Sequence, residues 1–160
     1  MELIKWKDSY SCGIDSIDEQ HKVIFVLINK VFDAIQGGKT HDVIKGVFIE
    51  LLEYANYHFA LESQLFELYH YADEQKHLDE HRWFIKKIQI MMIHDYLTGK
   101  ENLLETLHFL VEWFTDHILK TDMEYCKYFR FKEVLEEVDV FVRVRKFNEA
   151  YQKEMKPDGL

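Results

Sequence analysis

Four stretches of this chain carry apolar residues at alternating spacings of three and four, the pattern of helices that each bury one face. They cover about residues 18–36, 41–68, 74–96 and 101–125. The connections are short, with Gly37 and Gly38 in the first and Thr98-Gly99-Lys100 in the third. Short connections favour antiparallel neighbours. The pattern therefore predicts an all-α fold, an up-down-up-down four-helix bundle preceded by an irregular N-terminal arm over residues 1–16.

Polar residues interrupt the apolar seam of every predicted helix. The inward-facing polar positions are His21 on the first helix, His58 and Glu62 on the second, His77 and His81 on the third, and His117 on the fourth. They lie near the start of the first and third helices and near the end of the second and fourth. Antiparallel packing therefore brings them to the same end of the bundle, within about two turns at a rise of ~1.5 Å per residue.

This layer of polar residues predicts a metal site. A buried imidazole or carboxylate destabilises a fold unless it is paired or coordinated. A single inward histidine is ordinarily a satisfied core residue, but five of them with a glutamate in one layer favour metal binding. His58 and Glu62 are spaced i, i+4 on one helix face, as are His77 and His81. Imidazole and carboxylate ligands without thiolate suit iron, zinc or copper better than calcium or magnesium.

Composition narrows the class of protein. The chain has 160 residues, 48% of them apolar and 31% charged, which fits one globular domain. A formal net charge of −9 argues against binding to a phosphate backbone, so we expect no nucleic-acid partner. Neither a signal-peptide core nor a membrane-length apolar run is present, so we expect a cytoplasmic protein without a membrane partner. Cys12 and Cys126 are expected to be reduced, partly buried thiols.

From residue 6 to about residue 125 the sequence resembles the hemerythrin family, and specifically its single-domain bacterial members, the bacteriohemerythrins. The motifs that carry the resemblance are Gly13-Ile-Asp-x-Ile-Asp-x-Gln-His21, His58-Phe-x-x-Glu62, His77-x-x-x-His81-x-x-Phe84 and Trp113-x-x-x-His117-Ile-x-x-x-Asp122-x-x-Tyr125. The resemblance implies a non-haem di-iron centre whose seven ligands are His21, His58, Glu62, His77, His81, His117 and Asp122. Asp122 lies about 140° round an ideal helix from His117, so the resemblance alone assigns it.

The resemblance also implies a function. Two carboxylates and an oxo or hydroxo group would bridge the two irons, leaving one open coordination position at the iron held by His21 and His58. That position suits reversible binding of dioxygen, so we expect an oxygen carrier, storage or delivery protein and not an enzyme. The residues expected to line the oxygen pocket are Phe59, Trp113, Phe114 and Ile118. Phe114 stands where the family usually has leucine, which would narrow the pocket or slow ligand exchange.

Alternative functions remain open. The same centre could serve a sensor of oxygen, nitric oxide or iron that acts through a signalling partner, and an oxygen-using enzyme could be the recipient of delivered oxygen. A ferritin-like di-iron oxidase would use Glu-x-x-His on two helices. Glu74-x-x-His77 and Glu105-x-x-His108 are both present, but antiparallel packing places them at opposite ends of the bundle. A metal-free bundle with pH-sensing histidines is the least favoured interpretation.

The chain divides into a hemerythrin-like bundle with its arm over residues 1–129 and a C-terminal extension over residues 130–160. Residues 138–145 alternate with the period of a strand, but a lone strand would have no pairing partner. We therefore expect a fifth helix packed on or beside the bundle, which either caps it or docks a partner or a second copy. The four remaining histidines, expected to be surface or structural residues, are His41, His70, His94 and His108.

Overall fold

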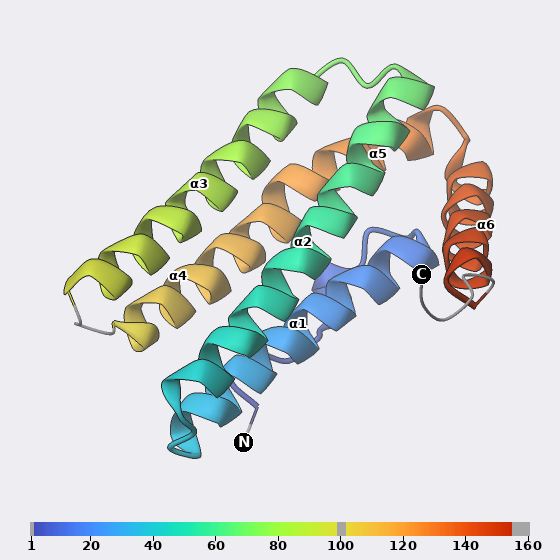
Figure 1. Ribbon diagram of the computed structural model, residues 1–160. Helices are drawn as coiled ribbons and strands as arrows, with labels where there is room; N and C mark the ends of the chain where they lie inside the picture. Colours follow the sequence, from blue (N-terminus) through green and yellow to red (C-terminus); the bar gives the residue numbers. More distant parts are fainter. Residues whose placement is uncertain (1, 99–101, 155–160) are drawn as a thin grey trace.

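Four long helices pack in the order that the sequence predicts (Figure 1). The computed structural model describes residues 2–98 and 102–154. The four helices are α1 (Asp15–Gln36), α2 (His41–Tyr69), α3 (Glu74–Thr98) and α4 (Leu103–Asp116). Helix α1 packs against α2 and α4, and α3 packs against the same two helices. The predicted up-down-up-down bundle is therefore confirmed, while Gly99 and Lys100 of the third predicted connection lie outside the described residues.

The predicted seams form the centre of the bundle. The buried apolar residues along these four helices include Ile24, Ile28, Val31, Ile44, Phe48, Leu51, Ala55, Phe84, Ile88, Leu107, Leu110 and Phe114. A second apolar cluster, formed around Leu61, Leu65, Phe66, Tyr125 and Phe129, packs against the arm and the C-terminal extension. Removal of this apolar surface from water is the main driving force for folding.

The first two connections are set by residues in the left-handed backbone region. Gly38 has φ +61°, and the amide of Lys39 after it donates to the carbonyl of Ala34 at 3.1 Å, which ends α1. His70 has φ +54° and caps the end of α2. A left-handed residue lets the last carbonyls of a helix accept hydrogen bonds as the chain turns away. His70 is thus an exposed residue with a structural role, which agrees with its prediction as a surface or structural residue.

Helix α1 begins at Asp15, three residues earlier than predicted, because the carbonyl of Ile14 already accepts a hydrogen bond from the amide of Asp18 at 2.9 Å. Over its described residues before α1, the arm contains one short 3-10 turn, η1 (Asp8–Tyr10), and is otherwise irregular as predicted. It lies along α1, where the Asn29 side chain accepts hydrogen bonds from the amides of Leu3 and Ile4 and donates to the carbonyl of Ile4.

The fourth helix continues beyond α4 in a different winding. A π-helical segment, η2 (His117–Asp122), leads directly into α5 (Met123–Phe131). In a π-helix the backbone hydrogen bonds run between residues five apart, and such segments occur frequently at functional sites. The sequence predicted one helix here and did not distinguish its three parts.

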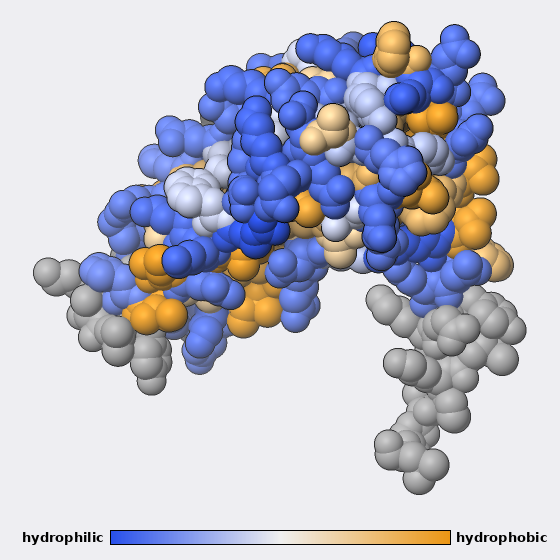
Figure 2. Space-filling view, turned by 90° about the horizontal axis from the view of Figure 1, so that it is seen from above, coloured by the Kyte–Doolittle hydropathy of each residue, from blue (hydrophilic) through white to orange (hydrophobic). Residues whose placement is uncertain are grey.

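The C-terminal extension contains the expected helix, α6 (Leu135–Glu154), which packs against α1. Val138 and Val142, one helical turn apart, are buried, and Asp139 accepts a hydrogen bond from the Ser16 amide at 2.8 Å. The outer face carries exposed Val140 and Val144, so two helical stripes of apolar residues produced the strand-like alternation. Figure 2 shows apolar side chains at the edge of the molecule where α6 lies. None of the described helices has both the length and the apolar content needed to cross a bilayer.

Candidate metal centre

The structure brings all seven side chains that the sequence singled out into one buried cluster. These residues are His21 from α1, His58 and Glu62 from α2, His77 and His81 from α3, and His117 and Asp122 from η2. None of them is more than 4% exposed. The cluster lies at the end of the bundle where α1 and α3 begin, between the two apolar clusters. Side chains from all four helices of the bundle therefore converge on one site.

The cluster contains two groups of side chains that could each hold a metal ion. One consists of Glu62, His77, His81 and His117, and the other of His21, His58, Glu62 and Asp122. Within each group the potential ligand atoms lie within 4.8 Å of one another. We call them the three-histidine group and the two-histidine group. Glu62 belongs to both, so the cluster has the form of a two-metal site with a shared carboxylate.

Both carboxylates turn one oxygen toward each group. Glu62 Oε1 lies 3.4 Å from His58 Nε2, while Glu62 Oε2 lies 3.2 Å from His81 Nε2. Asp122 Oδ2 lies 3.3 Å from His21 Nε2, while Asp122 Oδ1 lies 3.1 Å from His117 Nε2. Each carboxylate therefore lies between the two groups of imidazoles.

The π-helical segment explains how Asp122 reaches the cluster. In an α-helix a residue five positions after His117 would be rotated by about 140° from it. The π-helical winding reduces this rotation, because its turns are wider and its backbone hydrogen bonds join residues five apart rather than four. His117 and Asp122 thus face the same site. The interval of five residues between His117 and Asp122 could be read from the sequence. The π-helical winding that turns both side chains toward one site could not.

Electrostatics keep the carboxylates ionised and two of the imidazoles neutral. Burial lowers the pKa of His58 to about 4 and that of His81 to about 3, because a buried imidazolium loses its hydration. Burial would raise the pKa of Glu62, but the nearby histidines outweigh it and lower that pKa to about 2. For His117, burial is outweighed by the charge of Asp122 and by hydrogen bonding, which raise its pKa to about 10. The ionised Glu62 carboxylate and the neutral imidazoles of His58 and His81 are therefore donors that suit a cation.

Several buried polar atoms have no hydrogen-bond partner of normal geometry within the described part of the chain. They include both carboxylate oxygens of Glu62 and of Asp122. Imidazole Nε2 atoms also face one another, with His77 3.1 Å and His117 2.9 Å from His81. Unpartnered buried acceptors are costly, and crowded imidazole nitrogens cannot all donate to one another. Metal ions would satisfy these atoms together, so the residues present fit a di-metal group.

Two polar side chains accept hydrogen bonds from the Nδ1 atoms of cluster imidazoles. Neither of them had been identified from the sequence. His58 Nδ1 donates to Gln20 Oε1 at 2.9 Å. His117 Nδ1 donates to Glu80 Oε2 at 3.1 Å, and the Thr121 hydroxyl donates to the same oxygen at 2.9 Å. The hydrogen bond from His117 is the main reason that the pKa of Glu80 falls to about 2. Partners of this kind fix the orientation of metal-binding imidazoles.

Aromatic rings pack against the three-histidine group. The ring of Phe59 stacks on His81 with centroids 3.8 Å apart, and Trp113 stacks on His117 at 4.3 Å. Phe114 and Ile118 are both 1% exposed. Phe114 also lies against Trp113, with ring centroids 5.2 Å apart. Phe59 also lies against His58 of the two-histidine group, with ring centroids 5.9 Å apart. These apolar groups therefore restrict access of water to both parts of the cluster.

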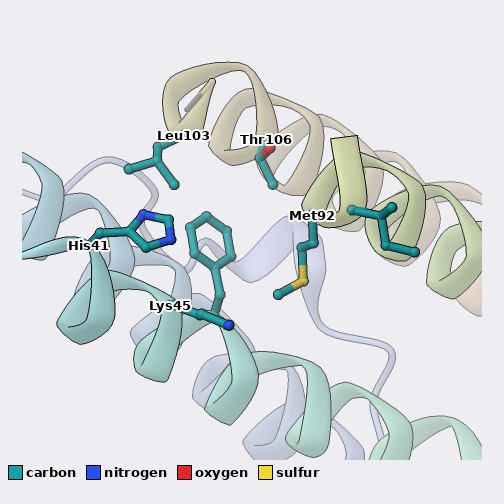
Figure 3. Close-up of a pocket in the computed structure, with 7 residues that line it drawn as sticks. His41, Lys45, Met92, Leu103 and Thr106 are labelled. Atoms are coloured by element: carbon teal, nitrogen blue, oxygen red, sulfur yellow. The ribbon is translucent and has the colours of Figure 1, made fainter. Parts of the chain in front are cut away.

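The other histidines lie outside the cluster. His41, His70, His94 and His108 are all exposed. Glu105 and His108 are both exposed on α4, so they do not join Glu74 and His77 in the shared site that a ferritin-like oxidase would need. A separate apolar pocket of about 260 Å³ lies between α2, α3 and α4 at the opposite end of the bundle, beside His41, Lys45 and Met92 (Figure 3). It contains none of the seven cluster residues.

Comparisons with known proteins agree with this geometry. Residues 12–129 match the hemerythrin HHE cation binding domain. The bacteriohemerythrin of Clostridium acetobutylicum is 34% identical over 127 residues, which are 77% of this chain and 98% of that protein. The bacteriohemerythrin of Pseudomonas aeruginosa is 34% identical over 125 residues, covering 78% and 80% of the two chains.

Two further matches have lower sequence identity. A hemerythrin-like protein of Naegleria gruberi is 29% identical over 75% of this chain and 88% of its own length. A solved crystal structure of a leucine-to-phenylalanine mutant has a TM-score of 0.71 and 27% identity, covering 79% of this chain and 97% of that one. The domain match spans most of the bundle and includes every residue of the buried cluster. The chain therefore belongs to the hemerythrin family.

Proposed function

We propose that the buried cluster holds two iron ions bridged by an oxo or hydroxo group and binds dioxygen reversibly. The observation that carries the proposal is the placement of the two carboxylates, each with one oxygen toward the two-histidine group and one toward the three-histidine group. Buried carboxylates shared between two sets of imidazoles suit a pair of metal ions. Family membership favours iron.

The unequal numbers of histidines assign the oxygen-binding side. His77, His81 and His117 would hold one iron, and His21 and His58 would hold the other, with Glu62 and Asp122 between them. When bound, the metal pair supplies the electrons that dioxygen accepts. The two-histidine group supplies one imidazole fewer than the three-histidine group. We therefore assign dioxygen to the iron that the two-histidine group would hold. The protein's own residues orient the imidazoles through Gln20 and Glu80.

The apolar lining supports oxygen carriage, storage or delivery over catalysis. We propose that Phe59, Trp113, Phe114 and Ile118 form the wall of the oxygen pocket, because all four are adjacent in sequence to cluster residues or lie one helical turn from them. Such a wall limits the entry of water and protons. It leaves little room for an organic substrate, and we therefore propose a binding protein and not an enzyme.

A sensor that acts through a partner is the second candidate, and the exposed face of α6 favours it. Val140, Val144 and Phe147 are 59%, 53% and 70% exposed and share one helical stripe. A partner or an oxygen-using enzyme could bind there. In this proposal residues 1–129 form the oxygen-binding unit, and residues 130–160 form an extension that transmits its state.

Spectroscopy and metal analysis of purified protein test the proposed function. The folded protein should contain two irons per chain, and the reduced protein should develop a visible band in oxygen that disappears under inert gas. Azide should compete for the same position in the oxidised protein. Multiple-turnover oxygen consumption with an added reductant would instead indicate an oxidase. Full iron loading without an oxygen-dependent band would favour an iron store or a sensor.

Replacement of Glu80 by alanine should weaken iron binding by roughly 10–100-fold without unfolding the protein, because loss of a hydrogen-bonded partner behind a ligand typically costs that much. Glu80 is partly exposed at the surface of α3, so its removal creates no core cavity. The measurement is iron retention in competition with a chelator. The matched control is Glu112→Ala, which removes an exposed glutamate from α4. Equal iron retention in both variants would contradict the role assigned to Glu80.

A further inference from the structure

The apolar pocket at the end of the bundle opposite to the metal cluster has the form of a second binding site. It has a volume of about 260 Å³ and lies between the start of α2, the end of α3 and the start of α4 (Figure 3). Its wall includes Phe48 from α2, Met92 and Ile93 from α3, and Leu103 from α4. Phe48 is buried, whereas Ile93 is 57% exposed. The pocket thus keeps apolar surface in contact with water, and a ligand that covers this surface gains free energy.

The size of the pocket indicates the size of its ligand. An apolar protein cavity of about 150 Å³ holds one molecule of benzene, which has six heavy atoms. By the same ratio, a volume of 260 Å³ holds about ten heavy atoms. The unbranched side chain of Met92 can adapt its shape to the ligand. A straight alkyl chain with one small polar head has this size.

Charge at the pocket favours an anionic head. Lys45 carries the only formal charge among the described residues that line the pocket, with histidine neutral, and it forms no ion pair within the described part of the chain. His41 and Leu103, which begin α2 and α4, also line the pocket. The N-cap residues Thr40 and Asn102 form no capping side-chain hydrogen bond. Amides at a helix start carry partial positive charge and bind anions.

Groups of opposite sign lie farther from the pocket. The end of α3 carries partial negative charge, but Met92 and Ile93 precede Thr98 by more than one helical turn. Asp42 and Glu105 lie in the first turns of α2 and α4, but both are exposed and neither is among the described residues that line the pocket. The rim of the pocket is therefore positive where its wall is apolar.

We propose that this pocket binds a medium-chain alkanoate, a carboxylate whose unbranched chain has about eight carbons. The alkyl chain occupies the space between Phe48, Met92 and Leu103, and the carboxylate lies at the rim beside Lys45. Figure 3 shows Leu103 and Thr106 on α4 facing His41 and Lys45 on α2 across this space. The pocket contains none of the seven cluster residues, so this binding does not depend on the oxygen-binding role.

Equilibrium dialysis of carbon-14-labelled octanoate against the full-length, iron-loaded protein tests the proposal. One octanoate per chain should bind with a Kd on the order of 10–100 µM, as expected for a well-buried ligand of about ten heavy atoms. Labelled octan-1-ol, which has the same chain but no charge, should bind about fivefold more weakly. Absence of bound octanoate at millimolar concentration would overturn the proposal. Equal affinity for octan-1-ol would overturn the preference for an anion.

Replacement of Lys45 by methionine tests the anionic head separately from the alkyl chain. Lys45→Met keeps an unbranched apolar side chain and removes the charge, so the affinity for octanoate should fall about fivefold while that for octan-1-ol stays unchanged. The matched control is Lys87→Met, which removes an exposed lysine of α3 that is not among the described residues lining the pocket. The control should bind octanoate like the wild type. Equal weakening in both variants would show that net charge, and not Lys45, attracts the carboxylate.

Replacement of Met92 by tryptophan tests the location of the alkyl chain. The larger ring narrows the pocket, so both octanoate and octan-1-ol should bind at least about tenfold more weakly. Iron content and melting temperature verify that the variant folds, and the Lys45→Met comparison stands if it does not. Unchanged affinity in folded Met92→Trp would place octanoate elsewhere and overturn the proposal. Displacement of azide from the oxidised protein by octanoate would likewise place the carboxylate at the iron and overturn it.

Discussion

Replacement of His117 by alanine is expected to leave the protein with less than half of its iron and to lower its melting temperature by on the order of 10 °C. His117 Nε2 lies 2.9 Å from His81 Nε2 and 3.1 Å from Asp122 Oδ1. Its removal takes one imidazole from the three-histidine group and leaves the buried Asp122 Oδ1 without its nearest nitrogen, and an unpartnered buried acceptor costs about 1–3 kcal/mol. Loss of bound metal removes further stabilisation of the folded state. Iron analysis and thermal unfolding measure the two effects.

The matched control for this substitution is His108→Ala. His108 lies on α4, the helix that leads into His117, but its side chain is exposed. The control should retain two irons per chain and a melting temperature within about 2 °C of the wild type, as expected for a surface change. Unchanged iron content in His117→Ala would show that the fourth helix contributes no histidine ligand.

Replacement of Ile118 by alanine should accelerate oxidation of the oxygenated protein about tenfold while the iron content stays at two per chain. Ile118 is 1% exposed and follows His117 directly. Removal of its branched side chain opens space for water and protons beside the cluster. A tenfold rate increase corresponds to a barrier lower by about 1.4 kcal/mol. The decay of the oxygen-dependent band gives the rate.

Ile88→Ala separates pocket opening from general loss of packing. Ile88 is also fully buried, but it lies seven residues beyond His81 in the main core. Both substitutions remove the same atoms from a core and should destabilise the fold by about 2–5 kcal/mol. Only Ile118→Ala should oxidise faster. Equal acceleration in both variants would attribute the effect to stability and would exclude Ile118 from the oxygen pocket.

The sequence by itself determined the bundle and the level at which the polar residues meet. Helical periodicity is a local property, and short connections leave few ways for successive helices to pack. The positions of His21, His58, His77 and His117 near alternating helix ends were therefore enough to predict one shared layer. The family resemblance, confirmed by the domain match, added Asp122 to that layer.

Only the tertiary structure decided how the layer becomes a site. The π-helical winding that turns Asp122 inward depends on a shift in backbone hydrogen bonding, which side-chain spacing does not specify. The hydrogen bond from His117 to Glu80 joins different helices. The buried apolar cluster that holds Cys12 and Cys126 joins the arm to α5. Such contacts depend on how packed elements are rotated and shifted relative to one another. The pattern of apolar residues in the sequence determines which face of a helix is buried. It does not determine which side chains of two packed helices meet.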